Sequence, residues 1–189
     1  MKLTILIPSI PERAGKAKKL INKLTKQIGD KDVQILMLVD NMKMTIGEKR
    51  ERLKNMVTSD YFAFVDDDDD IFDNYIDEIL KAIESGADVV TFRQKATVNG
   101  KSFEVDFGLK HENESLRISE DGKYLNVERQ PFHVCIWKTK LVQKYDFPFI
   151  QYGEDWGFCK QAITAVKTEH HIDKVIHHYR YDDNLTRAK

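Results

Sequence analysis

Short runs of consecutive apolar residues alternate with amphipathic stretches over the first half of the chain. The apolar runs, which are typical of buried strands, lie at residues 3–7, 33–39, 61–65 and 87–92. Between them, apolar positions at helical spacing predict helices at residues 13–28, 47–57 and 75–85. In the second helix we expect Leu53, Met56 and Val57 to face inward. Strands that are apolar almost throughout indicate a mostly parallel sheet with helices on both faces.

Turn-forming or polar residues follow three of these strands. They are Pro8, Ser9 and Ile10 after the first strand, Asp40 after the second, and the aspartates at residues 66–70 after the third. In a parallel sheet, ligands bind outside the carboxyl ends of the strands. The three ends therefore predict a cleft that holds a nucleotide and a metal ion.

The second half of the chain has a different pattern. Residues 97–130 are polar, with short alternating pieces such as residues 102–107. A strand, an amphipathic helix and a last strand are predicted at residues 131–138, 153–166 and 174–179. We expect short antiparallel additions to the sheet here. Because no linker or repeat divides the chain, we predict a single domain over residues 1–189.

The composition is that of a globular protein, with 41% hydrophobic residues and a formal net charge of -1. A net charge near zero gives no strong attraction to nucleic acid or to an anionic membrane. One basic stretch lies within the first predicted helix and comprises Lys16, Lys18, Lys19, Lys23 and Lys26. Its simplest interpretation is the solvated face of a helix, and the alternative is a patch that faces an anionic acceptor.

Cys135 and Cys159 are too few for a disulfide framework and lack the spacing of metal ligands. We expect two buried thiols in a reducing compartment. The apolar stretch at residues 3–7 is too short for a secretory signal. No window reaches the roughly 18 apolar residues of a membrane span. These features predict a cytoplasmic protein without a membrane anchor.

Five adjacent carboxylates at residues 66–70 need an explanation, because crowded like charges repel unless a cation or solvent relieves them. The simplest interpretation is a solvated turn before the next helix, with Asp73 or Asn74 as the N-cap. A calcium loop is a second interpretation. It would need glycine where Ile71 stands, and a preceding helix where a strand is predicted.

Two further interpretations involve phosphate chemistry. Haloacid-dehalogenase-like phosphatases have an Asp-x-Asp motif after an apolar strand, with the first carboxylate as nucleophile. That motif expects Thr or Val where Asp70 stands, and it normally lies near the N-terminus. Nucleotide-sugar transferases also have an Asp-x-Asp motif, whose carboxylates hold Mn²⁺ or Mg²⁺ against the diphosphate of the donor.

Residues 47–75 resemble the core of the family 2 glycosyltransferases, which have the GT-A fold. The residues at the family's spacing are Arg50, Tyr61, Phe64, Asp66, Asp68, Asp69 and Tyr75. Residues 5–10 resemble the family's first strand, and Asp40 matches the acidic residue that reads the base. The sequence departs from the family after Asp40, where Asn-Met replaces Gly-Ser. It departs again around Arg50, where Lys and Glu replace Ala and Asn.

Residues 153–158 resemble the family's Glu-Asp motif, which opens the helix beneath the acceptor site. The resemblance implies that Glu154 and Asp155 are catalytic, with Asp155 as the general base of an inverting reaction. The structural alternative is that acidic residues in the first turn of a helix are stabilised by its dipole. Residues 146–149 resemble the Phe-Pro segment before the motif.

Residues 175–180 resemble the last strand of the family, where some members place a histidine as a further metal ligand. His177 and His178 are adjacent in a predicted strand, so their side chains point to opposite faces. At most one of them can bind the metal, and we choose His178.

The resemblance implies a GT-A, Rossmann-like α/β fold with a nucleotide-sugar half at residues 1–96 and an acceptor-side half at residues 97–189. It implies a metal-dependent hexosyl- or pentosyltransferase that moves a sugar from a nucleoside-diphosphate donor, preferably a UDP-sugar, to an acceptor hydroxyl with inversion. The residues implied to contact the donor are Pro8, Ser9, Ile10, Asp40, Arg50 and Asp66. Those implied to bind Mn²⁺ or Mg²⁺ are Asp66, Asp68 and His178.

The sequence leaves the acceptor open among a soluble glycan, a small molecule and a modified DNA base. It also leaves two other functions open. One is a non-catalytic module that binds a metal or a nucleotide. The other is the Asp-x-Asp phosphatase.

Overall fold

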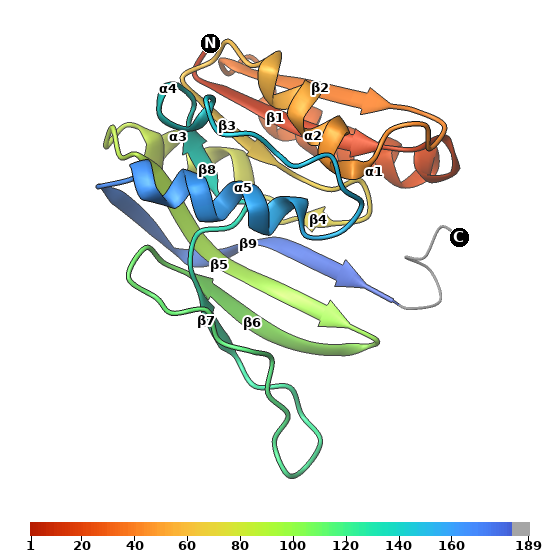
Figure 1. The fold of residues 1–189 in the computed structure, drawn as a ribbon, viewed down its shortest axis with the longest axis vertical. Coiled ribbons are helices and arrows are strands. Elements are labelled where there is room, and N and C mark those ends of the chain that lie inside the picture. The colour runs from red at the N-terminus through yellow and green to blue at the C-terminus, as the bar shows by residue number, and fades with distance from the viewer. Residues whose placement is uncertain (183–189) are drawn as a thin grey trace.

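The computed structural model describes residues 1–182, and residues 183–189 lie outside the described part. The first three strands are β1 (Leu3–Ser9), β2 (Val33–Val39) and β3 (Tyr61–Phe64). β1 lies between the other two and runs parallel to both. The carboxyl ends of the three strands therefore meet at one edge of the sheet, as the alternating pattern predicts (Figure 1).

The next strands extend this sheet. β8 (Ile136–Lys138) runs antiparallel to β3 and to β5 (Val89–Val98). β6 (Lys101–Phe107) forms a hairpin with β5, and β7 (Val127–Arg129) lies parallel to β6. The predicted fold class is confirmed, because parallel strands form the first half and antiparallel strands are added by the second.

Two further strands lie beside the acidic run. β9 (Glu169–Tyr181) runs parallel to β5 along the whole of that strand. β4 (Asp70–Ile71) pairs antiparallel with β9, so that Asp70 lies opposite His178. The last aspartate of the run is therefore a strand residue, and the end of β9 is brought next to the acidic loop.

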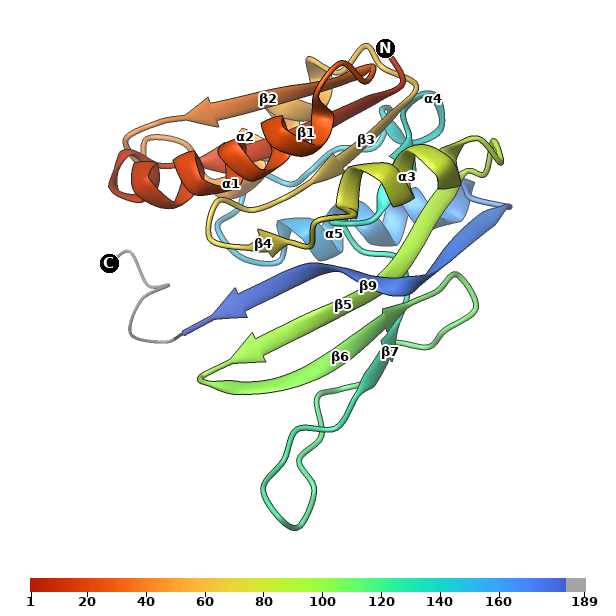
Figure 2. The same ribbon diagram turned by 180° about the vertical axis from the view of Figure 1, so that it is seen from behind.

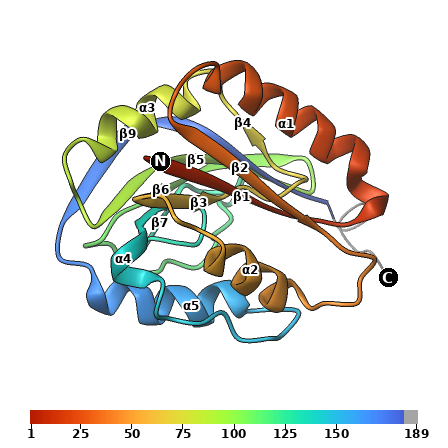
Figure 3. The ribbon, with the colours of Figure 1, turned by 90° about the horizontal axis from the view of Figure 1, so that it is seen from above.

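Helices cover both faces of the sheet (Figure 3). A 3-10 turn at Pro11–Arg13 precedes α1 (Ala14–Ile28), which shares one face with α3 (Tyr75–Ile83) (Figure 2). The other face carries α2 (Ile46–Asn55), α4 (Thr139–Val142) and α5 (Glu154–Ala162) (Figure 1). Within residues 1–182, none of the helices has the length and apolar character needed to cross a membrane.

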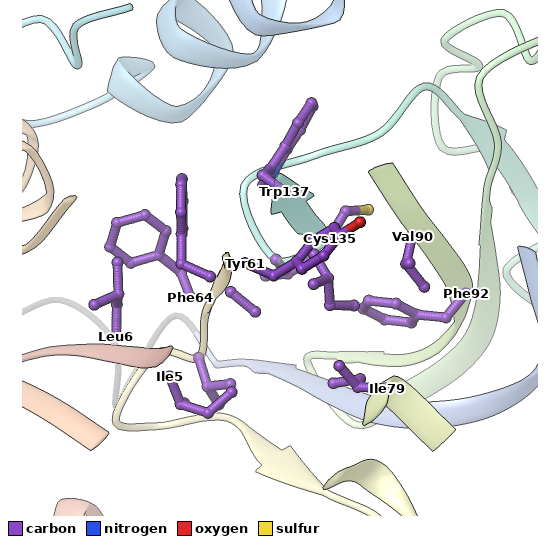
Figure 4. Packing of buried hydrophobic residues seen from close by; sticks show 14 of the residues in the cluster. Ile5, Leu6, Tyr61, Phe64, Ile79, Val90, Phe92, Cys135 and Trp137 are labelled. Carbon is purple, nitrogen blue, oxygen red and sulfur yellow. The ribbon is translucent and has the colours of Figure 1, made fainter. Parts of the chain in front are cut away.

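One hydrophobic cluster continues from the parallel strands into the second half of the chain (Figure 4). Phe64, at the end of β3, packs edge-on against Phe147 with ring centroids 5.4 Å apart. Phe147 in turn stacks on Phe158 of α5 at 4.2 Å, and Trp137 of β8 packs edge-on against Phe158 at 5.9 Å. These aromatic contacts hold α5 against the strand that leads into the acidic run.

The buried face of α2 differs from the expected one. Leu53 and Val57 are buried as predicted, but Met56 lies beyond the end of the helix and is 58% exposed. Charged side chains take most of the buried positions instead, namely Lys49, Arg50, Glu51 and Lys54. The prediction for Met56 was wrong, because the helix ends at Asn55, two residues before its predicted end, and leaves the Met56 side chain exposed.

The buried charges of α2 tie the helix to the segment before α5. Lys54 donates to the backbone oxygen of Tyr145. Glu51 accepts a hydrogen bond from the backbone nitrogen of Phe147 at 2.8 Å. Polar contacts therefore position the chain just before Glu154, where a purely apolar face would give no such direction.

Only residues 136–138 of the strand expected at residues 131–138 pair in the sheet. The chain turns before them, where the Cys135 nitrogen donates to the Phe132 oxygen at 2.9 Å, and Pro131 has no N–H to offer a ladder. The preceding residues form a loop that carries His133.

The last strand and the last helix also differ from their expected bounds. β9 begins at Glu169, five residues before the predicted start at residue 174. The prediction missed this first part because it is polar and shows no apolar run. The helix expected at residues 153–166 is α-helical only as far as Ala162 and continues as a 3-10 turn at Ile163–Ala165.

We predict that Gly47→Ala lowers the free energy of unfolding by about 1–3 kcal/mol through overpacking. A Cβ added at Gly47 would lie 1.9 Å from the backbone oxygen of Pro148, which belongs to the segment before α5. Gly15 of α1 is the matched control, because an added Cβ there meets nothing within 4 Å. Gly15→Ala should raise stability by about 0.5–1 kcal/mol. Urea unfolding followed by circular dichroism measures both changes, and equal effects of the two would contradict the close approach.

Candidate active site

Arg50 joins two distant parts of the sequence at the carboxyl edge of the sheet. Its Nη2 donates to Asp66 Oδ2 at 2.9 Å, and its Nε donates to Glu154 Oε1 at 3.1 Å. The guanidinium also lies over the ring of Phe64, 5.2 Å from its centroid. Arg50 is only 3% exposed, so this is a buried ion-pair network. It brings the acidic run and the Glu-Asp motif together.

The network changes the proton affinity of its members. Burial alone would raise the pKa of Asp66, but the Arg50 guanidinium beside it holds that pKa well below its usual range. Glu154 behaves differently, since burial outweighs the attraction of Arg50 and its pKa is raised. Asp66 is therefore the carboxylate that Arg50 keeps charged.

The remaining aspartates of the run also have partners. Asp67 accepts from Ser9 Oγ at 2.6 Å and from Arg13 Nη1 at 3.0 Å, and the same Arg13 nitrogen lies 3.1 Å from Asp68. Asp69 accepts from the backbone nitrogen of Arg180 at 3.0 Å, and Asp70 pairs with Lys23 at 2.6 Å. Because Asp67 and Asp69 are buried, the run is not the solvated turn of the simplest interpretation.

Burial and crowding leave two carboxyls of the run with raised pKa values. Burial, together with the neighbouring Asp66 charge, raises the pKa of Asp68 and raises that of Asp69 further. A bound cation would relieve this repulsion. Asp66 Oδ1 is buried and has no hydrogen-bond partner within the described part of the chain, so it has ligand capacity to spare.

Among residues 1–182, no group of three or more His, Cys, Asp or Glu side chains is placed to hold a metal by itself. The donor set fits a different kind of site, in which one or two carboxylates hold the ion and substrate phosphates complete its coordination. Mg²⁺ is commonly bound in this way. Asp66 and Asp68 are the residues that would hold such an ion.

The Glu-Asp motif opens α5 and presents its two acids differently. Gly153 has φ 84°, a conformation that favours glycine, and this turn starts the helix at Glu154. The Glu154 side chain is buried against Arg50, whereas that of Asp155 is 25% exposed. Asp155 Oδ1 accepts from the Trp156 nitrogen at 2.7 Å. Asp155 is therefore the acid of the pair that a substrate can reach.

His133 lies between the two carboxylates of the site. Its Nε2 is 3.8 Å from Asp66 Oδ2, and its Nδ1 is 3.6 Å from Asp155 Oδ2. Both distances exceed a hydrogen bond, and neither ring nitrogen has a hydrogen-bond partner within residues 1–182. The residue is only 7% exposed, and a buried polar atom left unpaired costs about 1–3 kcal/mol.

The two adjacent histidines of β9 have different surroundings, as their alternation predicts. His177 is fully buried, and its Nδ1 is hydrogen-bonded to Gln94 Nε2 at 3.0 Å. Its Nε2 lies 3.5 Å from Asp69 Oδ2. His178 is hydrogen-bonded through Nε2 to Thr97 Oγ1 at 2.9 Å and through Nδ1 to Arg180 Nε at 3.4 Å. Both ring nitrogens of His178 are thus engaged, and its role as a metal ligand stays a prediction.

The ends of β1 and β2 are linked by a lysine that the sequence analysis did not single out. Asp40 accepts from the backbone nitrogens of Lys43 and Met44 at 2.7 and 2.9 Å. Lys49 of α2 pairs with Asp40 and donates to the Ser9 oxygen at 2.7 Å. Burial would raise the pKa of Asp40, but these hydrogen bonds, above all that from Lys49, lower it.

The predicted donor residues of the first strand end are not equally accessible. Pro8 is buried within β1, and Ser9 is occupied by Asp67. Ile10 lines a small cavity of about 190 Å³ with Met37 and Val39, both of which are partly exposed at the edge strand β2. An apolar hollow of this kind at a strand end suits a planar base.

A larger cavity of about 540 Å³ lies on the α1 side of the acidic run. Asp68 and Asp70 form part of its lining, and His178 contributes from β9. Three lysines of the basic stretch also line it, namely Lys16, Lys19 and Lys23. These lysines therefore share a cavity with the acidic run, and Lys23 pairs directly with Asp70 at 2.6 Å.

The structure adds Arg13, Lys49 and His133 to the residues named from the sequence. Arg13 and Lys49 are single basic residues in a chain with many, and no spacing marks them. His133 stands alone in a segment read as a strand. Arg13 contacts Asp67, which is 54 positions away in the sequence. The partner of Lys49 is Asp40, and that of His133 is Asp155. No local pattern in the sequence reports contacts of this kind.

The sequence matches no protein-family model and no curated protein. Its fold is similar to solved structures of S. aureus TarS, a GT-A-type glycosyltransferase, which confirms the predicted fold. The structure of TarS 1-349 in complex with UDP-GlcNAc has a TM-score of 0.67 and 16% identity, over 97% of this chain and 59% of that chain.

Two other TarS structures are similar. The complex of TarS 1-349 with UDP has a TM-score of 0.67 and 17% identity, over 95% of this chain and 60% of that one. A longer TarS structure has a TM-score of 0.64 and 13% identity, over 95% of this chain and 37% of that one. The present chain thus spans at most 60% of these structures, and at such identities the likeness concerns the fold.

We predict that Arg50→Gln lowers the free energy of unfolding by about 3–5 kcal/mol, because it leaves buried carboxylates without their cation. Arg52, two residues away, is 60% exposed in its ion pair with Glu48, and Arg52→Gln should change stability by less than about 1 kcal/mol. Urea denaturation at pH 7 measures both variants. Equal effects would show that the network does not hold the site.

The ion pair of Arg50 with Asp66 also predicts how stability depends on pH. The folded pKa of Asp66 lies below its unfolded value, so its stabilisation is complete above about pH 4 and is lost progressively as the pH falls toward the folded pKa. The difference in stability between Arg50→Gln and the unmodified chain should therefore shrink below about pH 4. A difference that is constant from pH 7 to pH 3 would contradict the assignment.

Proposed function

We propose that this chain is a glycosyltransferase that moves a sugar from a nucleoside-diphosphate donor to an acceptor hydroxyl, with inversion and with Asp155 as general base. The observation that carries the proposal is the Arg50 network, which joins Asp66 of the acidic run to Glu154 of the Glu-Asp motif at 2.9 and 3.1 Å. A TarS structure of the same fold is a complex with UDP-GlcNAc, which supports a nucleotide-sugar donor, with UDP as the first nucleotide to test.

The donor would lie along the carboxyl ends of β1 and β2. The base would occupy the hollow beside Ile10, with Asp40 at its polar edge. Arg13, which already lies beside Asp67 and Asp68, is a cation in place to contact the diphosphate. The transferred sugar would then lie between Asp66 and Asp155. In an inverting reaction the acceptor oxygen approaches one side of the anomeric carbon while the diphosphate leaves from the other.

Asp155 would take the proton of the acceptor hydroxyl as that oxygen bonds to the anomeric carbon. The bond from the anomeric carbon to the diphosphate oxygen breaks, and its electron pair leaves with the nucleoside diphosphate. A single displacement of this kind inverts the anomer. Glu154 is buried against Arg50, so we assign it to positioning Arg50 rather than to proton transfer.

We propose that Asp66 and Asp68 hold Mn²⁺ or Mg²⁺ together with the diphosphate, and that His178 is the candidate third ligand. When bound, such an ion would neutralise the negative charge that develops on the leaving diphosphate. The raised pKa of Asp68 is in keeping with a carboxylate that a cation would relieve.

The phosphatase alternative is less well supported by the geometry. Its nucleophile would be Asp66, and a nucleophilic carboxylate needs an oxygen open to the phosphorus atom. Asp66 Oδ2 is held by the Arg50 guanidinium, which leaves a single oxygen for such an attack. The non-catalytic module stays open, because the chain spans about 60% of the similar structures.

The acceptor is proposed to be a soluble glycan or small molecule, with a modified DNA base as the third candidate. For a DNA acceptor, activity should fall steeply with salt, because each phosphate contact releases a counterion. The two free, buried thiols agree with the proposed cytoplasmic location.

Two substitutions test the mechanism. Asp155→Asn should lower the rate of transfer by roughly 100-fold to 10,000-fold without changing donor affinity, because only the proton acceptor is removed. Asp68→Ala should abolish transfer and weaken Mn²⁺-dependent donor binding. Asp77→Ala on α3, where the side chain is 66% exposed, is the control and should leave both unchanged. Calorimetry of UDP-sugar binding and release of nucleoside diphosphate provide the measurements.

Each outcome has a distinct meaning. Full activity in Asp155→Asn would refute the assignment of the base. Retained Mn²⁺ and donor affinity in Asp68→Ala would refute the metal site. Binding of a donor from a panel of nucleotide sugars without any turnover, by hydrolysis or transfer, would favour the non-catalytic module.

A further inference from the structure

We propose that His133 selects the transferred sugar by binding one of its hydroxyl groups in the gap between His133 Nε2 and Asp66 Oδ2. The inference rests on the proposed function and names a specificity-determining residue for it. It starts from a buried imidazole whose two nitrogens have no hydrogen-bond partner within the part of the chain that the structure describes.

The ring of His133 is held in place by its surroundings and not by hydrogen bonds. Phe132 packs edge-on against it, with ring centroids 5.0 Å apart, and Phe64 lies 6.4 Å away. The loop itself is fixed, since the Phe132 oxygen accepts from the Cys135 nitrogen at 2.9 Å and from Trp137 Nε1 at 3.1 Å. The imidazole is therefore presented in one orientation, which is a requirement for selecting a substrate group.

His133 Nε2 and Asp66 Oδ2 are close enough for one oxygen that lies beside them to contact both. The two edges of this gap, Nε2 and Oδ2, are 3.8 Å apart, which is too far for a direct hydrogen bond. An oxygen placed beside both atoms can lie about 2.8 Å from each. The second gap, between Nδ1 and Asp155 Oδ2, has a similar width of 3.6 Å.

A hydroxyl group is the chemistry that these edges select. A carboxylate only accepts hydrogen bonds, so the bridging group must donate to Asp66. A neutral imidazole either donates or accepts at Nε2, according to its tautomer. In the tautomer that carries the Nε2 proton, a hydroxyl can accept from Nε2 while donating its single proton to Asp66. A carbonyl or phosphate oxygen has no proton to donate, and an ammonium group cannot accept.

The location identifies which hydroxyl is meant. His133 lies between Asp66, on the donor side, and Asp155, the proposed base. In the proposed reaction the anomeric carbon must pass between these two carboxylates. A ring hydroxyl of the transferred sugar is then the group that reaches His133. Hydrogen-bonding sites reject an analogue without the hydroxyl because their polar atoms are left unpaired.

The test compares donors that differ by one hydroxyl. Nucleoside diphosphate release is measured for the best natural UDP-sugar and for its deoxy analogues, each lacking one ring hydroxyl. The unmodified chain should lose at least about 100-fold in kcat/KM with one analogue. In His133→Phe this particular loss should fall below about 3-fold, while the losses with the other analogues persist. His133→Gln, which can still donate and accept, should restore part of the discrimination.

Control measurements separate this inference from folding and from the proposed function. His171→Gln on β9, whose histidine bonds to Thr91, should leave all discrimination unchanged. UDP affinity should be the same in both His133 variants as in the unmodified chain, and a single cooperative thermal transition in each variant should show that it folds. Undiminished discrimination in both variants would overturn the role of His133 while the glycosyltransferase assignment stands. Absence of binding and turnover with every nucleotide sugar in the unmodified chain would overturn both.

Discussion

Arg50 is the interaction on which the arrangement of the site depends. Its guanidinium is buried, lies over Phe64, and donates both to Asp66 and to Glu154, which are 16 and 104 positions away in the sequence. A buried charge without partners is unfavourable, so the acidic loop and the start of α5 are each held against it. The aromatic contacts from Phe64 through Phe147 to Phe158 act in the same direction and hold α5 on the sheet. Charge and packing therefore position the same two segments.

The acidic run shows how a single stretch of like charge is divided by its surroundings. Asp66 is kept charged by Arg50, whereas burial and the Asp66 charge raise the pKa of Asp68 and Asp69. Asp70 faces Lys23 and has become part of a strand. Identical neighbouring residues thus differ in the direction of their pKa shifts, and the two with raised pKa values are those that a cation would relieve. A functional interpretation of the run consequently concerns individual positions rather than the block.

His133 represents the opposite situation, in which polar atoms are buried without partners. The paired charges around it contribute to holding the site, while its own nitrogens, 3.6 and 3.8 Å from two carboxylates, contribute no hydrogen bond. Unpaired buried groups of this kind are rare in folded proteins, and they concentrate where a ligand completes the contacts. Arg50 is paired with carboxylates of two segments, whereas the proposed role of His133 rests on ring nitrogens that have no hydrogen-bond partner within residues 1–182.

The sequence by itself predicted the parallel half of the sheet and its helices, which the structure confirms, and it named Arg50, Asp66, Glu154 and Asp155 as site residues, which stays a prediction. The strands, helices and strand ends follow from local periodicity, because these patterns are properties of neighbouring residues, whereas Arg50, Glu154 and Asp155 were indicated by the resemblance to the family. Only the tertiary structure decided that β9 pairs along the whole of β5, that residues 131–135 form a loop, and that α2 buries charges where Met56 was expected. Only it brought Arg13, Lys49 and His133 to the site, since their partners come from other elements of the fold. Contacts between residues far apart in the chain leave no periodic trace in the sequence, and for that reason the position of His133 beside Asp66 and Asp155 was visible only in the folded chain.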